Sequence, residues 1–245
     1  MNKQRVVSLF LLAGMAVSSQ SYAAIAMDRT RVIFDGDQKA LSLNISNQNQ
    51  QLPYLAQAWI EDDKGNKIDG PLTILPPVQR VEPGAKSQVK IQTLAGINML
   101  KQDQETLFYF NLREIPPRSD KANVLQLALQ TRVKLFYRPA ALVPKEATVA
   151  STWQNDLTMT KQGNGYKVNN PSGYYVTLVD ARAAGSTTKN KFKPVMVAPK
   201  SSADLGVDDL GSSPLVTYIN DYGGRPTLHF SCGGSECKVI ANKVE

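Results

Sequence analysis

Residues Asn123 to Arg138 read Asn-Val-Leu-Gln-Leu-Ala-Leu-Gln-Thr-Arg-Val-Lys-Leu-Phe-Tyr-Arg. Apolar side chains alternate with mostly polar ones along this segment, as in a β-strand with one apolar face. The apolar set is Leu125, Leu127, Leu129, Val133 and Leu135. The segment is nearly three times as long as the average strand of ~5 to 6 residues. We therefore predict one long strand over 123–138, with part of its apolar face at an open edge and available to another protein. The alternative is a long core strand that its own domain covers.

Short alternating segments separated by turn residues precede this strand. Met27 to Phe34 and Tyr54 to Ile60 are each followed by a turn that contains Asp and Gly. Leu107 to Ile115 is strongly apolar and is closed by Pro116-Pro117. Seven or so strands of this kind over about 115 residues are typical of an immunoglobulin-like β-sandwich.

The segment Arg138 to Pro144 interrupts the strand pattern, because proline cannot donate to a sheet ladder. Short strand-like segments resume between Leu157 and Ala241. We therefore predict an all-β protein with two immunoglobulin-like β-sandwich domains. The predicted parts are a signal peptide at 1–23, an N-terminal domain with the long strand at 24–138, a hinge at 139–144 and a C-terminal domain at 145–245.

Residues 1–23 have the three parts of a secretory signal peptide. Lys3 and Arg5 provide positive charge, Val6 to Val17 forms an apolar core, and Ser21-Tyr22-Ala23 fits a cleavage site. That core is too short to span a bilayer, and no later segment approaches the ~20 apolar residues that a spanning helix needs. We predict an exported protein that begins at Ala24 and does not insert into a membrane.

The charge balance is basic but does not indicate a nucleic-acid partner. The chain has 28 Lys and Arg against 21 Asp and Glu, a net charge of +7, and loss of Lys3 and Arg5 leaves 26 minus 21, or +5. These basic residues are scattered and do not interleave with aromatic residues. We therefore expect no binding to nucleic acid.

The sequence contains no motif for catalysis, a cofactor or a metal. His229 is the only histidine, and neither a G-x-S-x-G elbow nor a G-x-x-x-x-G-K-[ST] loop is present. Cys232 and Cys237 are spaced for a disulfide across a hairpin in an oxidising compartment, and too few Cys and His residues remain for a zinc cluster. We predict no enzyme, no cofactor and no metal, although composition alone leaves a carboxylate-pair hydrolase open.

Seven motifs closely resemble the periplasmic chaperones of chaperone–usher pili. The resemblance covers the whole predicted mature chain, and it thins only around residues 183–190 and 201–213. The motifs are Asp28-Arg-Thr-Arg31, Phe34-Asp-Gly36, Gln51-Leu-Pro-Tyr-Leu-Ala-Gln-Ala-Trp-Ile60, Pro76-Pro-Val-Gln-Arg80, Glu82-Pro-Gly-Ala-Lys-Ser87, Leu107-Phe-Tyr-Phe-Asn-Leu-Arg-Glu-Ile-Pro-Pro-Arg118 and Tyr218-Ile-Asn-Asp-Tyr-Gly-Gly-Arg-Pro226. The resemblance implies a boomerang of two immunoglobulin-like domains that works in the periplasm, with pilus subunits and an outer-membrane usher as partners.

The same resemblance implies how the chain holds a subunit. A pilus subunit is an immunoglobulin-like fold that lacks its last strand, and Leu125, Leu127 and Leu129 fill the groove that this leaves. Arg31 and Lys134 hold the terminal carboxylate of the subunit in the cleft between the domains. The implied function is to bind, fold and cap subunits by donor-strand complementation and to deliver them to the usher.

A second charged set, Glu105, Arg138 and Asp221, matches residues that fix the angle between the two domains. Two other classes of protein remain open. A pilus subunit or adhesin would lack the long final strand and would carry a donor extension at its N-terminus. A glycan-binding sandwich would present exposed aromatic residues beside paired carboxylates.

Overall fold

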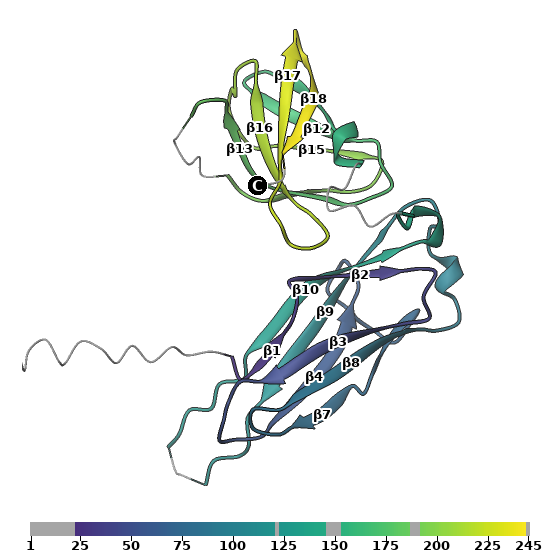
Figure 1. Ribbon diagram of the computed structural model, residues 1–245, viewed down its shortest axis with the longest axis vertical. Coiled ribbons are helices and arrows are strands. Elements are labelled where there is room, and N and C mark those ends of the chain that lie inside the picture. The colour runs from purple at the N-terminus through teal and green to yellow at the C-terminus, as the bar shows by residue number, and fades with distance from the viewer. Residues whose placement is uncertain (1–22, 121–122, 146–152, 187–191, 244–245) are drawn as a thin grey trace, which may run out of the picture.

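The computed structural model describes residues 23–120, 123–145, 153–186 and 192–243. Figure 1 shows two β-rich lobes, the lower one from the N-terminal half of the chain and the upper one from the C-terminal half. The described helices are 3-10 turns, η1 (Ile97–Met99), η2 (Ala140–Leu142) and η3 (Trp153–Asp156), and none of them is long and apolar enough to cross a membrane. Apart from Ala23, the predicted signal peptide at 1–23 lies outside the described residues.

The N-terminal domain is a sandwich of two sheets. Its strands are β1 (Ile25–Met27), β2 (Arg31–Asp35), β3 (Ala40–Asn47), β4 (Tyr54–Glu61), β5 (Lys67–Ile68), β6 (Leu72–Leu75), β7 (Val78–Val81), β8 (Lys86–Thr93), β9 (Thr106–Ile115) and β10 (Gln130–Arg138). One sheet has the order β1-β3-β8-β6, and the other has the order β2-β10-β9-β4-β5, with β7 also paired to β4. The prediction of an immunoglobulin-like sandwich is confirmed for this domain.

Both faces of β10 are used, as its alternating sequence requires. Leu135 and Tyr137 belong to the apolar core between the two sheets. Phe136 points to the opposite face and is also buried, with its ring centroid 5.5 Å from that of Tyr175 in the C-terminal domain. The outer face of this sheet therefore meets the second domain.

The two neighbours of β10 differ in how much of it they cover. β9 pairs with β10 in antiparallel register from Gln130 to Tyr137, which is all of β10 except its last residue. β2 runs parallel to β10 and pairs with it only from Lys134 to Arg138. The edge of β10 that β2 covers therefore has no partner strand from Gln130 to Val133 among the described residues.

The prediction of one strand over 123–138 is wrong for its first seven residues. β10 begins at Gln130, and residues 124–129, here called the arm, belong to no strand in the described structure. The last backbone bond toward β9 runs from Glu114 N to Leu129 O, at 3.0 Å. Pro116 and Pro117 follow β9, and proline has no N–H with which to continue a ladder. The arm leaves the sheet for this reason.

The C-terminal domain has its own core, built from one continuous sheet. Its strands are β11 (Thr158–Gln162), β12 (Gly165–Asn170), β13 (Val176–Ala183), β14 (Val195–Val197), β15 (Ser201–Asp204), β16 (Pro214–Ile219), β17 (Thr227–Gly233) and β18 (Glu236–Lys243). The order is β14-β13-β16-β17-β18-β11-β12-β15, around buried residues such as Leu178, Tyr218 and Phe230. The predicted disulfide is confirmed, because Cys232 and Cys237 are cross-strand partners in the β17–β18 hairpin and are bonded.

Candidate functional site

Arg31 and Lys134 lie side by side where β2 begins to pair with β10. They are register partners in this parallel pair, so their side chains leave the sheet on the same face. That face is the one that meets the C-terminal domain, since Phe136 lies two residues further along β10. The fold thus brings together two cations that are about a hundred residues apart in the sequence.

Neither cation has a carboxylate partner among the described residues. Lys134 Nζ donates a hydrogen bond to Thr177 Oγ1 at 3.1 Å, and Arg31 Nη1 donates to Ile219 O at 3.1 Å. No ion pair to another described residue involves either of them. Arg31 Nε is buried and finds no hydrogen-bond acceptor in the described part of the chain. An unpaired buried donor beside a second cation is an arrangement that an anion would complete.

The pKa values of the two cations reflect this unbalanced charge. Burial, and next the charge of Arg31, lower the pKa of the Lys134 amine to about 8. Burial also lowers the pKa of the Arg31 guanidinium, against the opposing effects of Asp221 and Glu105. The folded chain therefore holds two positive charges at a cost that a bound carboxylate would reduce.

We expect the affinity for a peptide with a free C-terminal carboxylate to fall as the pH rises through 8. Lys134 carries its proton below its pKa of about 8 and loses it above, so the decline approaches roughly tenfold per pH unit. Calorimetric titration between about pH 6 and pH 10 measures it. Lys134→Arg is the matched control, because a guanidinium keeps its proton over this range. The same decline in Lys134→Arg would show that another group titrates.

The arm presents its leucines to solvent. Leu125, Leu127 and Leu129 are 83%, 66% and 47% exposed, and they precede Lys134 on the same run of chain. Exposed leucines at alternate positions, in a segment that forms no strand of its own, provide an apolar surface that another protein can cover. The sequence prediction that these residues are available to a partner thus agrees with their exposure, although they do not lie in a strand.

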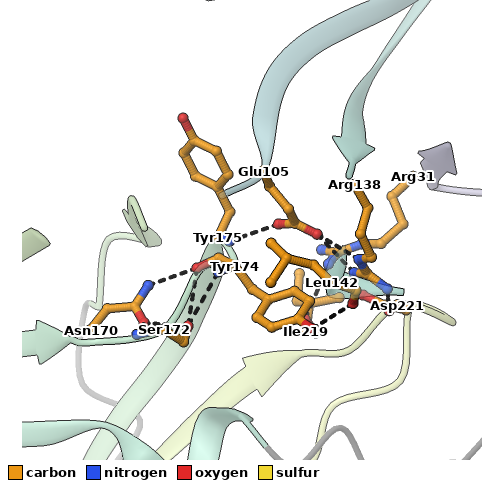
Figure 2. A network of polar contacts seen from close by, with 10 residues as sticks. All are labelled: Arg31, Glu105, Arg138, Leu142, Asn170, Ser172, Tyr174, Tyr175, Ile219 and Asp221. Atoms are coloured by element: carbon orange, nitrogen blue, oxygen red, sulfur yellow. Dashed lines mark hydrogen bonds and ion pairs between the residues drawn. The ribbon is translucent and has the colours of Figure 1, made fainter. Parts of the chain in front are cut away.

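The predicted charged set near the hinge converges on one guanidinium (Figure 2). Arg138 Nε donates to Glu105 Oε1 at 2.9 Å, and Arg138 Nη1 donates to Asp221 Oδ2 at 2.8 Å. Glu105 in turn accepts a bond of 2.8 Å from the backbone N–H of Tyr175. Glu105 and Arg138 come from the N-terminal domain, whereas Asp221 and Tyr175 come from the C-terminal domain. These contacts connect the two domains directly.

Burial of this set shifts its protonation equilibria. Burial raises the pKa of Glu105 to about 7, although Arg138 and the bond from Tyr175 oppose the shift. Burial works to lower the pKa of Arg138, but Asp221 and Glu105 outweigh it and raise that pKa. The guanidinium also lies 5.1 Å and 5.2 Å from the ring centroids of Tyr174 and Trp153, which stack on each other at 4.0 Å. Arg138 thus combines ion pairs and aromatic contacts at the interface between the two domains.

The contacts that the C-terminal domain makes with the cation pair could not be predicted from the sequence. Thr177 lies on β13 and Ile219 ends β16, and the sequence pattern predicts both segments only as ordinary strands. A threonine in a strand and a backbone carbonyl carry no sequence signal for such a role. Tyr218 to Pro226 was singled out as a motif, yet its backbone contact with Arg31 becomes visible only in the folded chain.

Known proteins resemble both domains. Residues 24–143 match the family described as "Pili and flagellar-assembly chaperone, PapD N-terminal domain", and residues 152–230 match "Pili assembly chaperone PapD, C-terminal domain". The chain is 49% identical over 239 residues to the chaperone protein PapD of Escherichia coli, which covers 97% of this chain and 96% of PapD. It is 47% identical over 225 residues to the probable fimbrial chaperone YfcS of Escherichia coli K12, covering 91% and 89%. The structure of the CupB2 chaperone of Pseudomonas aeruginosa matches with a TM-score of 0.69 and 30% identity, covering 85% of this chain and 100% of that one.

These matches confirm the predicted family, and with it the all-β architecture of two domains. They favour neither of the two other classes, a pilus subunit or adhesin and a glycan-binding sandwich, because the relatives that match 97% and 91% of this chain are chaperones by name. The family consists of assembly chaperones and not of enzymes. The chain is therefore a member of the PapD family of pili assembly chaperones.

Proposed function

We propose that this chain works in the periplasm, where it binds, folds and caps pilus subunits by donor-strand complementation and then delivers them to an outer-membrane usher. The signal-like residues 1–23 support export, and the domains proposed for the mature chain are 24–138 and 145–245, with the hinge at 139–144. Arg31 and Lys134 bind the terminal carboxylate of the subunit. Leu125, Leu127 and Leu129 enter its groove.

One juxtaposition carries this proposal: the cation pair lies where the open edge of β10 ends. β2 occupies that edge only from Lys134 onward, in parallel with β10. A subunit strand whose carboxylate is bound at Arg31 and Lys134 would fill the vacant edge before Lys134, and it would also run parallel to β10. The carboxylate would then set the register of the whole added strand.

The leucines of the arm lie at distances from the cations that suit a subunit core. They precede Lys134 by five, seven and nine residues, which at ~3.3 Å per residue corresponds to roughly 17 to 30 Å. Burial of three leucine side chains offers about 5 to 9 kcal/mol before the cost of association. A slip of one residue would present Gln126 and Ala128 to the groove in their place.

The contacts at the hinge support a fixed cleft. Arg138 joins Glu105 to Asp221, so the angle between the domains depends on ion pairs that water largely cannot reach. We propose that this set holds Thr177 and the Ile219 carbonyl opposite the cation pair.

Co-expression of the chain with pilus subunits tests the function as a whole. We expect a subunit to copurify with the chain from the periplasm and to be degraded or aggregated without it, because its open groove exposes apolar residues. A subunit that accumulates equally in both strains, and that does not copurify, would contradict the proposal.

A further inference from the structure

The topology of the N-terminal domain indicates which edges of a donated strand must form hydrogen bonds. β10 is the last strand of this immunoglobulin-like domain, and it pairs on one edge with β2 and on the other edge with β9. A subunit that lacks the equivalent last strand would have a groove with two strand walls. If the chain caps such subunits as proposed above, the arm must offer hydrogen bonds along both of its edges.

A hairpin with β9 would block one of these edges. The register of the pair continues from Gln130 opposite Arg113 to Leu129 opposite Glu114, where the backbone bond of 3.0 Å forms. Bonded pairs alternate in an antiparallel ladder, so the next one would join Leu127 to the residue at position 116. Position 116 is a proline, which has no N–H to donate to Leu127 O. The ladder therefore ends at Leu129 and does not reach Leu127 or Leu125.

A side chain makes the contacts of the arm in place of this ladder. Gln126 Nε2 donates to Pro117 O at 2.5 Å, and Gln126 Oε1 accepts a longer bond of 3.4 Å from Ser119 N. Both contacts lie on the exposed surface, where water can replace them. Gln126 can thus keep the arm beside the residues that follow β9 without occupying the backbone groups of the arm.

We propose that Pro116 keeps the β9-side edge of residues 124–129 free for a pilus subunit, because it ends the β9–β10 ladder at Leu129. The donor-strand complementation proposed above requires both edges of the arm. The subunit strand that ends at Arg31 and Lys134 would use the edge on the β2 side, and Pro116 leaves the opposite edge available to a second strand of the same subunit.

Pro116→Val tests this inference, and Pro117→Val is the matched control. Valine at 116 restores an N–H at a bonded position of the ladder, whereas the N–H of valine at 117 would point away from the arm. In the free protein we expect Pro116→Val to slow hydrogen exchange at Leu125 and Leu127. We expect it to weaken or slow capture of a copurifying pilus subunit by about 2- to 13-fold for each ladder bond that must open. Pro117→Val should behave as the wild type in both measurements.

A synthetic peptide of the subunit's C-terminal strand separates this inference from the proposed function. The peptide uses only the β2 side and the cation pair, so both proline variants should bind it as the wild type does. The inference would be overturned if the amides of Leu125 and Leu127 stayed unprotected in Pro116→Val. It would also be overturned if these amides became protected but subunit capture did not change, or if Pro117→Val had the same effect as Pro116→Val. Peptide binding that does not depend on Lys134 would instead count against the proposed function.

Discussion

Replacing Lys134 by alanine is expected to abolish most of the binding to a peptide with a free C-terminal carboxylate. The amine lies beside Arg31 and has no acidic partner in the described part of the chain, and both cations can donate charge-assisted hydrogen bonds to one carboxylate. Loss of one partner from a buried, hydrogen-bonded charge pair costs about 2 to 5 kcal/mol, which corresponds to a weakening of roughly 30-fold or more. Calorimetric titration of the peptide measures this loss.

Amidation of the C-terminal carboxylate of the peptide shows whether Lys134 binds that carboxylate. Amidation should weaken binding to the wild type and should make little further difference to Lys134→Ala, because the same interaction is already lost. An equal loss on amidation in both proteins would mean that the carboxylate binds elsewhere.

Folding of Lys134→Ala serves as the control for this experiment. The pKa of the amine falls on folding, from ~10.4 in the unfolded chain to about 8, so its charge opposes folding at neutral pH. This penalty disappears as the pH rises from 8 toward 10.4, and over that window the free energy of unfolding of the wild type should increase. The variant should be as stable as the wild type at pH 7, or more stable by less than about 1 kcal/mol, because water screens the partly exposed amine.

Leu127→Glu is expected to fold normally and to lose subunit binding. Leu127 is 66% exposed in the free protein, so the substitution should change the free energy of unfolding by no more than about 0.5 kcal/mol. In the complex the new carboxylate would enter an apolar groove without a partner, at a cost of several kcal/mol. Thermal unfolding measures the first effect, and copurification of a periplasmic subunit measures the second.

Leu52→Glu provides the comparison for Leu127→Glu. Leu52 is 46% exposed on the loop between β3 and β4, so it introduces the same charge at an exposed leucine away from the arm. It should leave subunit binding unchanged. If Leu127→Glu retains as much subunit as Leu52→Glu, the arm does not enter the subunit.

The alternation of apolar and polar residues predicted most of the strands. Where the structure differs from that prediction, contacts between distant parts of the chain explain the difference. Met27 to Phe34 alternates like one strand, but the chain crosses between the two sheets there, so β1 pairs with β3 and β2 pairs with β10. β15, Ser-Ser-Ala-Asp, has no β-branched or large apolar residue and forms because β12 offers an edge to it. The arm has a strong strand pattern and yet forms no strand, because Pro116 removes the donor of its partner.

The residues of the candidate site could be predicted from the sequence only through its resemblance to the chaperone family. Nothing in the local pattern of residues 31 or 134 indicates that they meet, since a parallel pairing over so long a separation depends on the whole sheet. The exposure of the arm was predictable, because the segment is longer than its domain can cover. The contacts of Thr177 and Ile219 depend on the domain interface, which no periodicity encodes.

Because β2 covers only part of β10, the binding site would also distinguish complete polypeptide chains from longer or unfinished ones. If a subunit strand ends with its carboxylate at Arg31, the next position along that edge of β10 is already occupied by β2 itself. A chain with even one more residue would have to displace a strand of the chaperone's own sheet. The chain would therefore accept only polypeptides that have been synthesised to their last residue, and a subunit with an added C-terminal tag would be refused however well its groove matched the arm.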